Sequence, residues 1–211
     1  MREVAVMAGL NCAGRGGRRR AAFIAGAVLA CAAAAPQPAQ AQAQEGAWVG
    51  EARKVAMSVP PKLLAVLTAE IDKGGAASAV TVCRERAPEL AQAASVETGW
   101  QVRRVSLRQR NPKAVPDAWE RAALEDFDRR AAAGESPATL EKAELVQEEG
   151  RAVQRYMRAL PVQAICTQCH GAAAQLGPGV AERLHELYPE DRGTGYRAGE
   201  IRGAMTIRRA Q

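Results

Sequence analysis

The sequence predicts an α+β domain, in which helices flank an antiparallel β-sheet. Apolar residues recur with helical spacing in the first half of the chain, and later segments alternate between apolar and polar residues, with a glycine between two of them. These patterns are typical of amphipathic helices and of strands joined in a hairpin. With 47% hydrophobic and 25% charged residues, the composition excludes a collagen-like, coiled-coil or wholly disordered chain.

Residues 1–41 have the features of a secretory signal peptide. Four arginines between residues 15 and 20 precede an apolar run from Ala21 to Ala35, and the small residues of Ala39-Gln40-Ala41 follow. Because this run is shorter than the roughly 20 residues that span a bilayer, we expect cleavage after Ala41 and a periplasmic protein without an integral membrane segment. The leader accounts for most of the net charge of +6, so no basic excess indicates nucleic-acid binding.

Lipid anchoring is an alternative fate for this leader. The segment Val28-Leu29-Ala30-Cys31 partly resembles a lipobox, which would be cleaved before Cys31 and acylated on that cysteine. Leucine two residues before the cysteine is unusual in such a motif. We therefore favour the small-residue site at Ala41 over an anchor at Cys31.

Helices are expected in the segment that follows the leader. We assign residues 42–59 to a linker and the start of the N-terminal helix, and residues 60–211 to the folded domain; the Ala-, Gln- and Pro-rich linker itself covers residues 36–45. Apolar residues continue the first helix until Gly74-Gly75. A second helix contains Cys83 and is expected to end at Pro88. The apolar positions of the first helix are Leu63, Leu64, Val66, Leu67 and Ile71.

A strand and a third helix are expected next. Residues 101–109 alternate between apolar and polar side chains, as in a half-buried strand, and Asn111-Pro112 ends it. Asp117 can cap a helix that runs through Phe127, with Glu120 at the reciprocal position of a capping box.

The C-terminal part predicts a hairpin and a final strand. After a loop over residues 137–142, two alternating segments at 143–148 and 151–158 enclose Gly150. Residues 204–208 form the last strand.

Cys166-Thr167-Gln168-Cys169-His170 is the C-x-x-C-H pattern that attaches a c-type haem. If this segment is helical, both cysteines and His170 lie on one face of a single turn. Two thioether bonds would then hold the porphyrin while the imidazole reaches the iron. Removal of the leader takes Cys12 and Cys31 away and leaves three cysteines, an odd number that does not indicate a disulfide framework.

Two other chemistries use the same pair of cysteines. A dithiol redox motif has the C-x-x-C spacing, normally where a strand enters a helix, and a zinc site would need at least one more ligand. Neither requires His170, and the exported context also favours haem c.

The third cysteine, Cys83, is a candidate for the second axial position of a haem iron. A lone thiol in an exported protein is reactive unless it is buried or bound, and Arg84 and Arg86 would favour a thiolate. From the residues alone, ligation and simple burial as a small hydrophobe are equally open. The remaining candidates rank lower: His185 second, as an exposed position of an amphipathic helix, and Met57, Met157 and Met205 third, in segments whose pattern suggests core or sheet packing.

Several short motifs, each occurring once, lie along residues 60–209, and together they are specific. They are the cysteine-bearing segment 79–88, the strand 99–107, Arg110-Asn111-Pro112, residues 116–120, Leu160-Pro161-Val162, residues 166–171 and 188–191, Gly195-Tyr196 and residues 199–204. In these stretches the chain resembles the Tll0287-like family of c-type haem domains, also called DUF3365. It departs from the family after Asn111-Pro112, where relatives often have a second asparagine and this chain has Lys113.

The resemblance implies a PAS-like fold with one covalently attached haem c. Its iron would be held by His170 on one side and by Cys83 on the other. Four arginines, Arg103, Arg104, Arg108 and Arg110, could pair with the haem propionates, although such a row is more often a solvated sheet face.

An iron with two strong protein ligands has no open position, which disfavours oxygen activation and peroxidase chemistry, so we do not expect an enzyme. The PAS resemblance favours a redox or gas sensor in which reduction or a diatomic ligand displaces Cys83, with a separate signalling partner. A periplasmic electron carrier is the alternative, and sulfur-compound oxidation is a remote third class. Thiolate ligation predicts a lower reduction potential than that of a His/Met cytochrome.

Overall fold

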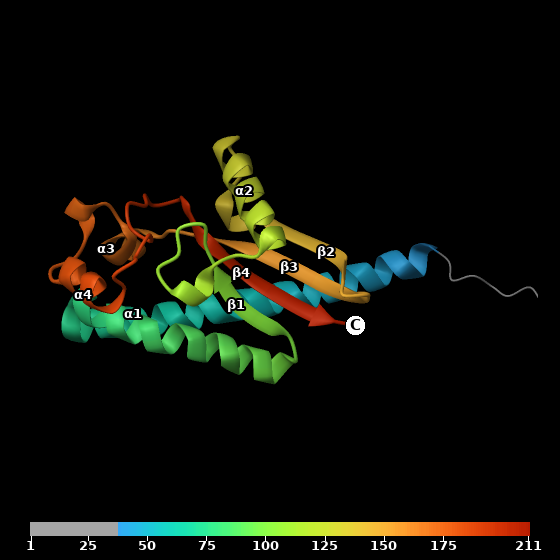
Figure 1. Ribbon diagram of the computed structural model, residues 1–211, viewed down its shortest axis with the longest axis horizontal. Coiled ribbons are helices and arrows are strands. Elements are labelled where there is room, and N and C mark those ends of the chain that lie inside the picture. Colours follow the sequence, from blue (N-terminus) through green and yellow to red (C-terminus); the bar gives the residue numbers. More distant parts are fainter. Residues whose placement is uncertain (1–37) are drawn as a thin grey trace, which may run out of the picture. The chain divides into compact units, whose positions relative to one another are not determined.

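Helix α1 (Pro38–Thr98) is a helical hairpin. The computed structural model describes residues 38–211, and within α1 the backbone of Gly75 is non-helical, with φ 78° and ψ 175°. Glycine adopts positive φ without a Cβ penalty, so the chain reverses there. Figure 1 shows the two arms side by side, the first in blue and teal and the second in green. The predicted break at Gly74-Gly75 is confirmed.

The second arm of α1 is longer than the sequence predicted. The prediction that Pro88 ends this helix is wrong, because the helix continues through Pro88 to Thr98. Proline inside a helix removes one hydrogen bond and costs about 3 kcal/mol. Beyond it, Ala91 and Ala94 are buried against Trp48 of the first arm, and this packing offsets the cost.

The first arm also begins earlier than expected. Residues from Pro38 on are helical, whereas we expected a linker over 36–45. Trp48, Ala52 and Val55, in the segment assigned to linker and helix start, are buried core residues. The leader features at residues 1–37, including Cys31, lie outside the described residues.

Four antiparallel strands form one sheet in the order β1-β4-β3-β2. The strands are β1 (Gln101–Val105), β2 (Glu141–Glu148), β3 (Arg151–Pro161) and β4 (Ile201–Ala210). Glu149 and Gly150, both with positive φ (52° and 77°), form the two-residue turn between β2 and β3, as a tight hairpin requires. The predicted hairpin and last strand are confirmed.

Strand β1 ends at Val105, four residues before the predicted end. The backbone N–H of Ser106 donates to the carbonyl of Ala114 (3.0 Å), and its hydroxyl donates to the carbonyl of Arg202 (2.8 Å). Ser106 therefore leaves the ladder and joins the loop that contains the short helix η1 (Pro112–Ala114).

Helix α2 (Ala118–Ala132) begins with the predicted capping box. The Asp117 carboxylate accepts from the N–H of Glu120 (2.9 Å), and the Glu120 carboxylate accepts from the N–H of Asp117 (2.9 Å). This satisfies two backbone donors that the first turn leaves free. The helix runs five residues beyond the predicted end at Phe127, and the loop expected at 137–142 contains η2 (Pro137–Thr139) before β2 begins at Glu141.

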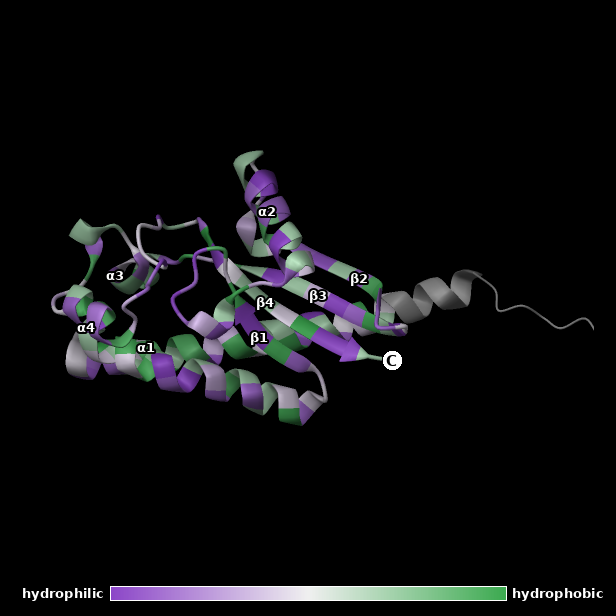
Figure 2. Ribbon diagram, viewed as in Figure 1, coloured by the Kyte–Doolittle hydropathy of each residue, from purple (hydrophilic) through white to green (hydrophobic). Residues whose placement is uncertain are grey.

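The two faces of the sheet are covered by different helices. Hydrophobic and hydrophilic residues are interspersed along its strands (Figure 2), because successive side chains of a strand point to opposite faces. On β4, Ile207 packs against α1 while Ala204 packs against α2, and on β3 Tyr156 and Met157 divide in the same way. The described residues therefore form an α+β fold around an antiparallel four-stranded sheet, as predicted.

The connection from β3 to β4 packs against the tip of the α1 hairpin. It contains η3 (Ala164–Cys166), α3 (Thr167–His170), η4 (Ala173–Gln175) and α4 (Val180–Leu187). Val180 and Leu184 of α4 form a buried cluster with Ala76 and Val80 of α1. Within residues 38–211, no helix carries an apolar stretch long enough to cross a membrane.

Candidate functional site

The C-x-x-C-H segment is helical, which meets the condition under which both cysteines and His170 were expected to share one face. Cys166 ends η3 with φ −67° and ψ −24°, and α3 continues the turn through His170. Positions i, i+3 and i+4 of a helix share one face, so both thiols and the imidazole belong to one turn. Gly171 follows the turn, and its N–H donates to the carbonyl of Thr167 (2.8 Å). A Cβ at this position would overlap the same carbonyl oxygen, so only glycine fits there.

The Nδ1 atom of His170 lies 2.7 Å from the carbonyl oxygen of Gly193. A carbonyl only accepts, so Nδ1 carries the proton and Nε2 keeps its lone pair. Nε of Arg202 also lies 3.1 Å from Nδ1, but it cannot donate to a nitrogen that is already protonated. Burial, with the charges of Arg202 and Arg110, lowers the pKa of His170 well below its ordinary value. The imidazole is therefore neutral, which is the form that binds metals.

The backbone around His170 is fixed by the loop that precedes β4. The His170 carbonyl accepts from the N–H of Tyr196 (2.9 Å). Nη2 of Arg110 donates to the Cys169 carbonyl (2.6 Å) and forms an ion pair with Asp191 (3.0 Å). Both side chains of this pair are only 10% exposed. A buried, hydrogen-bonded ion pair of this kind fixes the orientation of the motif.

Cys169 faces the tip of the α1 hairpin. It packs against the buried α1–α4 cluster, and its thiol is 3.8 Å from the Ala76 carbonyl. Burial raises the pKa of Cys169 to about 11; Arg110 opposes the shift, and the neighbouring thiols of Cys83 and Cys166 add to it. Cys83 and Cys166 thus both act on the pKa of Cys169, although 83 residues separate Cys83 from Cys166. All three are free thiols of intermediate exposure.

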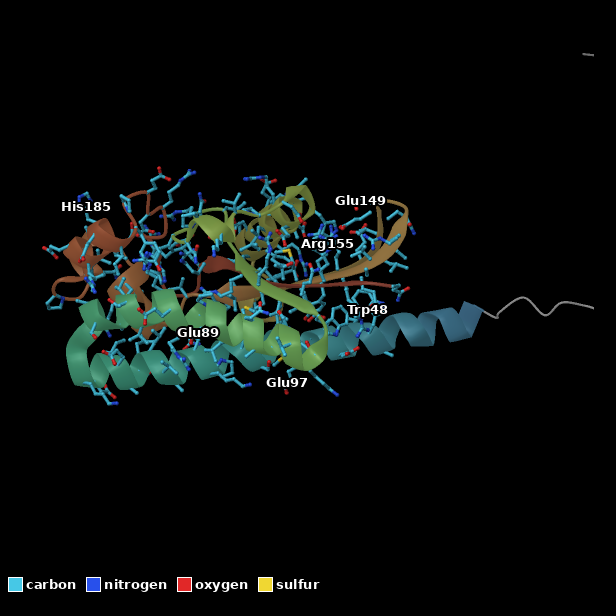
Figure 3. All side chains as sticks on the ribbon, turned by 60° about the horizontal axis from the view of Figure 1, so that its bottom comes forward. Trp48, Glu89, Glu97, Glu149, Arg155 and His185 are labelled. Carbon is cyan, nitrogen blue, oxygen red and sulfur yellow. The ribbon has the colours of Figure 1, made fainter. Side chains whose placement is uncertain are left out.

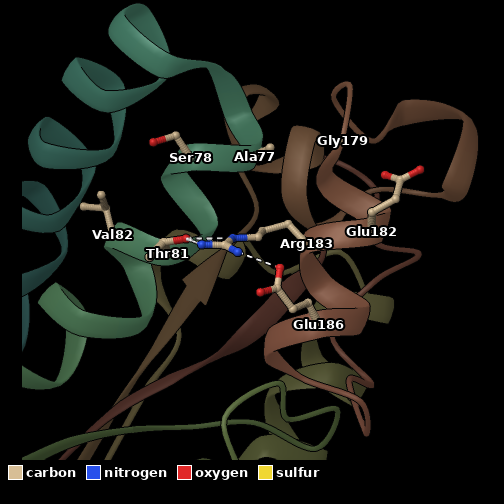
Figure 4. Close-up of a pocket in the computed structure, with 8 residues that line it drawn as sticks. All are labelled: Ala77, Ser78, Thr81, Val82, Gly179, Glu182, Arg183 and Glu186. Carbon is tan, nitrogen blue, oxygen red and sulfur yellow. Dashed lines mark hydrogen bonds and ion pairs between the residues drawn. The ribbon is translucent and has the colours of Figure 1, made fainter.

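Helix α4 joins the motif region to the α1 arm that carries Cys83. Arg183 donates to the Thr81 hydroxyl through Nε (2.9 Å) and Nη2 (2.8 Å), and it also pairs with Glu186 (2.6 Å). Figure 4 shows these contacts at one side of a groove of about 590 Å³ between the two helices. Thr81 lies two residues before Cys83, so this contact fixes the helical turn that presents the cysteine.

The lower-ranked axial candidates lie in other environments. His185 is exposed on α4 (Figure 3), as predicted. Met157 and Met205 are fully buried in the sheet core, where methionine fills space. Met57 is 51% exposed on α1, so the expectation that it packs in the core is wrong.

The donor set fits haem better than zinc. Across residues 38–211, no three His, Cys, Asp or Glu side chains are grouped so that they could hold a metal ion, as a structural zinc site requires. A haem iron takes four nitrogens from the porphyrin and needs only two from the protein. A neutral imidazole with its Nδ1 proton fixed, two adjacent thiols and a third thiol nearby meet that requirement.

Of the four arginines suggested for the propionates, three have other partners. Arg103 pairs with Glu120 of α2, Arg108 donates to the Thr194 carbonyl, and Arg110 pairs with Asp191. Arg104 forms no hydrogen bond or ion pair with any described residue. Its charge adds to the lowering of the pKa of His170.

Sequence reasoning missed Arg202 and Gly193 as site residues. Both lie more than 20 positions from the motif, and no local pattern marks them. Arg202 is 9% exposed beside His170, and a Cβ on Gly193 would overlap its Nη2 atom. The only sequence signal is that Gly199 to Ala204, which includes Arg202, belongs to the motifs shared with the family.

Comparison with known proteins agrees with this fold. The Tll0287-like family, described as Tll0287, matches residues 31–209. A crystal structure described as that of the cyanobacterial heme-protein Tll0287 is similar with a TM-score of 0.59 and 23% identity, and the match covers 83% of this chain and 98% of that one. At this identity the likeness shows a common fold. None of the curated proteins matches. Because the family match spans most of the length of this chain, the chain belongs to the Tll0287-like family.

Proposed function

We propose that this protein carries one haem c, bound through thioethers to Cys166 and Cys169, and acts as a redox or gas sensor outside the cytoplasm. His170 and Cys83 would hold its iron. The observation that carries the proposal is the arrangement of His170: its Nδ1 proton is held by the Gly193 carbonyl, and Nε2 is left as the metal-binding atom on the same helical turn as two thiols. Membership of a family that includes a protein described as a heme-protein supports haem as the cofactor.

Covalent attachment follows from the two motif thiols. Each thiol would add across one haem vinyl group, with a C–S bond formed and the thiol hydrogen passing to the other vinyl carbon. Haem c supplies an iron that can cycle between the ferrous and ferric states. The protein's part is to hold the porphyrin at Cys166 and Cys169 and to orient His170 toward the iron.

Cys83 makes the site suited to sensing. It lies on α1, whereas His170 lies on the β3–β4 connection, so the two axial ligands come from elements that are far apart in sequence. Displacement of Cys83 on reduction or by a diatomic ligand would release the α1 arm from the iron. That release is a two-state change of the kind a signalling partner can detect. If His170 and Cys83 both held the iron, no open position would be left for enzymatic chemistry.

Rapid mixing of the reduced holoprotein with CO or NO tests the sensor role against an electron carrier. We expect fast binding of the gas, with loss of the thiolate spectrum. The Cys83→Ala variant, in which that position is open, is the matched control and should bind without a displacement phase. A reduced protein that binds neither gas and cycles reversibly between oxidation states would instead be an electron carrier.

Export is a further part of the proposal. Intact mass of the protein purified from the periplasm is expected to correspond to a chain that begins at residue 42. A lipid-modified mass beginning at Cys31 would identify the lipoprotein alternative.

A further inference from the structure

The two edges of the β-sheet differ in length and in cover. At one edge, β1 is five residues long, and the guanidinium of Arg103 donates to the carbonyl of Val115 (3.3 Å) in the loop that runs beside it. At the other edge, β2 is eight residues long and pairs with β3 on its inner side (Figure 1). An uncovered edge strand presents a row of free backbone N–H and C=O groups, with which another chain can pair.

The hydrogen bonds of β3 identify the free backbone groups of β2. The N–H of Ala159 donates to the carbonyl of Leu140 (3.0 Å), so the even-numbered residues up to Glu148 direct their backbone groups toward β3. The carbonyl of Ala152 accepts from Gln211 on the β4 side (2.9 Å), as this alternation requires. The odd-numbered residues of β2 therefore direct their backbone groups outward, where no residue within 38–211 bonds to them. They are Glu141, Ala143, Leu145 and Gln147.

The acidic residues of β2 offer little repulsion to a second strand. Charged side chains commonly protect an edge strand from pairing. Here, however, Glu148 pairs with Arg155 (3.1 Å) and with Arg208. Glu141 pairs with Arg158 (2.9 Å). Their charges are thus compensated from within the chain, and the free edge is not closed by like charges.

The side chains of β2 are complementary to those of a second β2 in one antiparallel register. Outward-directed residues must lie opposite one another, because a hydrogen-bonded pair exchanges both of its N–H···O bonds. With residue 145 on a two-fold axis, Leu145, which is 45% exposed, faces Leu145 of the second copy. Ala143 then faces Gln147, and Lys142 faces Glu148 at both ends of the ladder. Apolar and opposite-charge pairs across a ladder are both stabilising.

Neighbouring registers lack this complementarity. Moving the axis to residue 146 would set Glu144 opposite Glu148, and like charges directly opposite are destabilising. Moving it to residue 144 would leave Lys142 opposite Val146, without a partner of opposite charge. The sequence of the free edge therefore favours one symmetric arrangement.

We propose that two copies of this protein pair along β2 in this register, so that their sheets form one continuous antiparallel sheet. The interface is isologous, since the same residues contribute from both copies. One pair of edge strands buries less than the roughly 1,200 Å² of a stable interface, so the dimer is weak and forms as the concentration rises. This inference does not depend on the proposed haem c.

Sedimentation velocity of the purified protein from about 10 µM to about 1 mM tests the dimer. Leu145→Lys sets two like charges opposite each other at the axis, and Ala143→Pro removes an outward N–H but no hydrogen bond to β3. Val96→Lys is the matched control, because Val96 is an apolar residue of α1 that is 77% exposed. Circular dichroism verifies the fold of each variant. If Ala143→Pro fails to fold, Leu145→Lys carries the comparison.

We expect the wild type and Val96→Lys to form dimers with the same dissociation constant. Leu145→Lys and Ala143→Pro should raise that constant at least about tenfold, because each disrupts the ladder between the two copies. A wild type that stays monomeric up to about 1 mM would overturn the inference. So would a dimer that forms equally well in both β2 variants, since it would use another surface.

A charge reversal tests the register. Lys142→Glu sets like charges at both ends of the ladder and should weaken the dimer, more at low than at high salt because salt screens the repulsion. Lys73→Glu makes the same change of net charge at an exposed position of α1 and is the control. Equal dissociation constants for these two variants at low salt would contradict the pairing of Lys142 with Glu148.

Discussion

Nδ1 of His170 and the carbonyl oxygen of Gly193 are 2.7 Å apart, and this contact determines which imidazole nitrogen can bind a metal. Gly193 also donates a hydrogen bond of its own, from its N–H to the Asp191 carboxylate (2.7 Å). Asp191 in turn pairs with Arg110, which holds the carbonyl of Cys169. The metal-binding form of the motif thus depends on a loop more than 20 residues away.

Gly193→Ala should destabilise the protein, because the new Cβ would overlap Nη2 of Arg202. Overpacking of this kind costs about 1–3 kcal/mol. The melting temperature of the variant checks this, with Gly50→Ala as control, since a Cβ at Gly50 meets no atom within 4 Å. Equal melting temperatures for the wild type and Gly193→Ala would show that Arg202 is not held where the structure places it.

Cys83→Ala should retain the proposed covalent haem but raise its midpoint potential, because a thiolate ligand would stabilise ferric iron. The absorption spectrum of the ferric protein should change as the sixth ligand is lost. Spectroelectrochemistry measures both effects. Glu97→Gln, an exposed change near the end of the same helical arm, is the control and should leave both unchanged. If Cys83→Ala has the same spectrum and midpoint potential as the wild type, Cys83 does not bind the iron.

Glu141 should make stability depend on acid pH. Nε of Arg53 donates to its carboxylate (2.8 Å), and Tyr156 (2.7 Å) and Arg158 (2.9 Å) also donate to it. Arg53, opposed by burial and aided by Tyr156, lowers the pKa of Glu141 from 4.5 to about 2. The folded protein therefore binds this proton less readily than the unfolded chain does. The stabilisation is complete above pH 4.5 and is lost as the pH falls from there toward 2.

Melting temperatures of wild type and Glu141→Gln between pH 2 and 7 measure this contribution. The difference between the two proteins should be largest above pH 4.5 and shrink toward pH 2. Glu97→Gln, an exposed change near the end of α1, is the control and should show no such trend. A difference in melting temperature that stays constant from pH 2 to pH 7 would contradict the hydrogen bonds and ion pairs assigned to Glu141.

Asp117 has two roles, and two substitutions separate them. Asp117→Ala removes the helix cap, which costs about 1 kcal/mol, and also removes a partner of the buried Arg155. Asp117→Asn keeps a capping oxygen and loses only the charge, so it should cost less. Denaturant unfolding measures both, with Asp126→Asn on the exposed side of α2 expected to stay within about 0.5 kcal/mol of the wild type. If both Asp117 variants lose the same free energy of unfolding, the helix cap contributes little to stability.

Local chemistry explains which elements could be predicted. The capping box at Asp117 and Glu120, the turn at Gly150 and the break at Gly75 each depend on residues within a few positions of one another. The C-x-x-C-H motif from Cys166 to His170 is also local, and its shared helical face followed once the segment was taken as helical. These features were visible because the residues that cause them are neighbours in sequence.

The remaining features depend on contacts between distant segments. Helix α1 continues past Pro88 because Ala91 and Ala94 pack against the opposite arm, and β1 stops at Val105 because Ser106 bonds to Arg202, 96 residues later. Arg202 likewise lies beside His170 because of contacts between segments that are distant in the sequence. Periodicity and propensity contain no information about such contacts, which is why the outer residues of the candidate site were missed.

The most direct test is the intact mass of the exported protein, combined with its pyridine haemochrome spectrum. We expect one haem per chain, which remains attached after extraction with acidified organic solvent, and its loss when Cys166 and Cys169 are both changed to serine. A colourless wild-type protein, or a pigment that the solvent extracts, would contradict covalent haem at this motif.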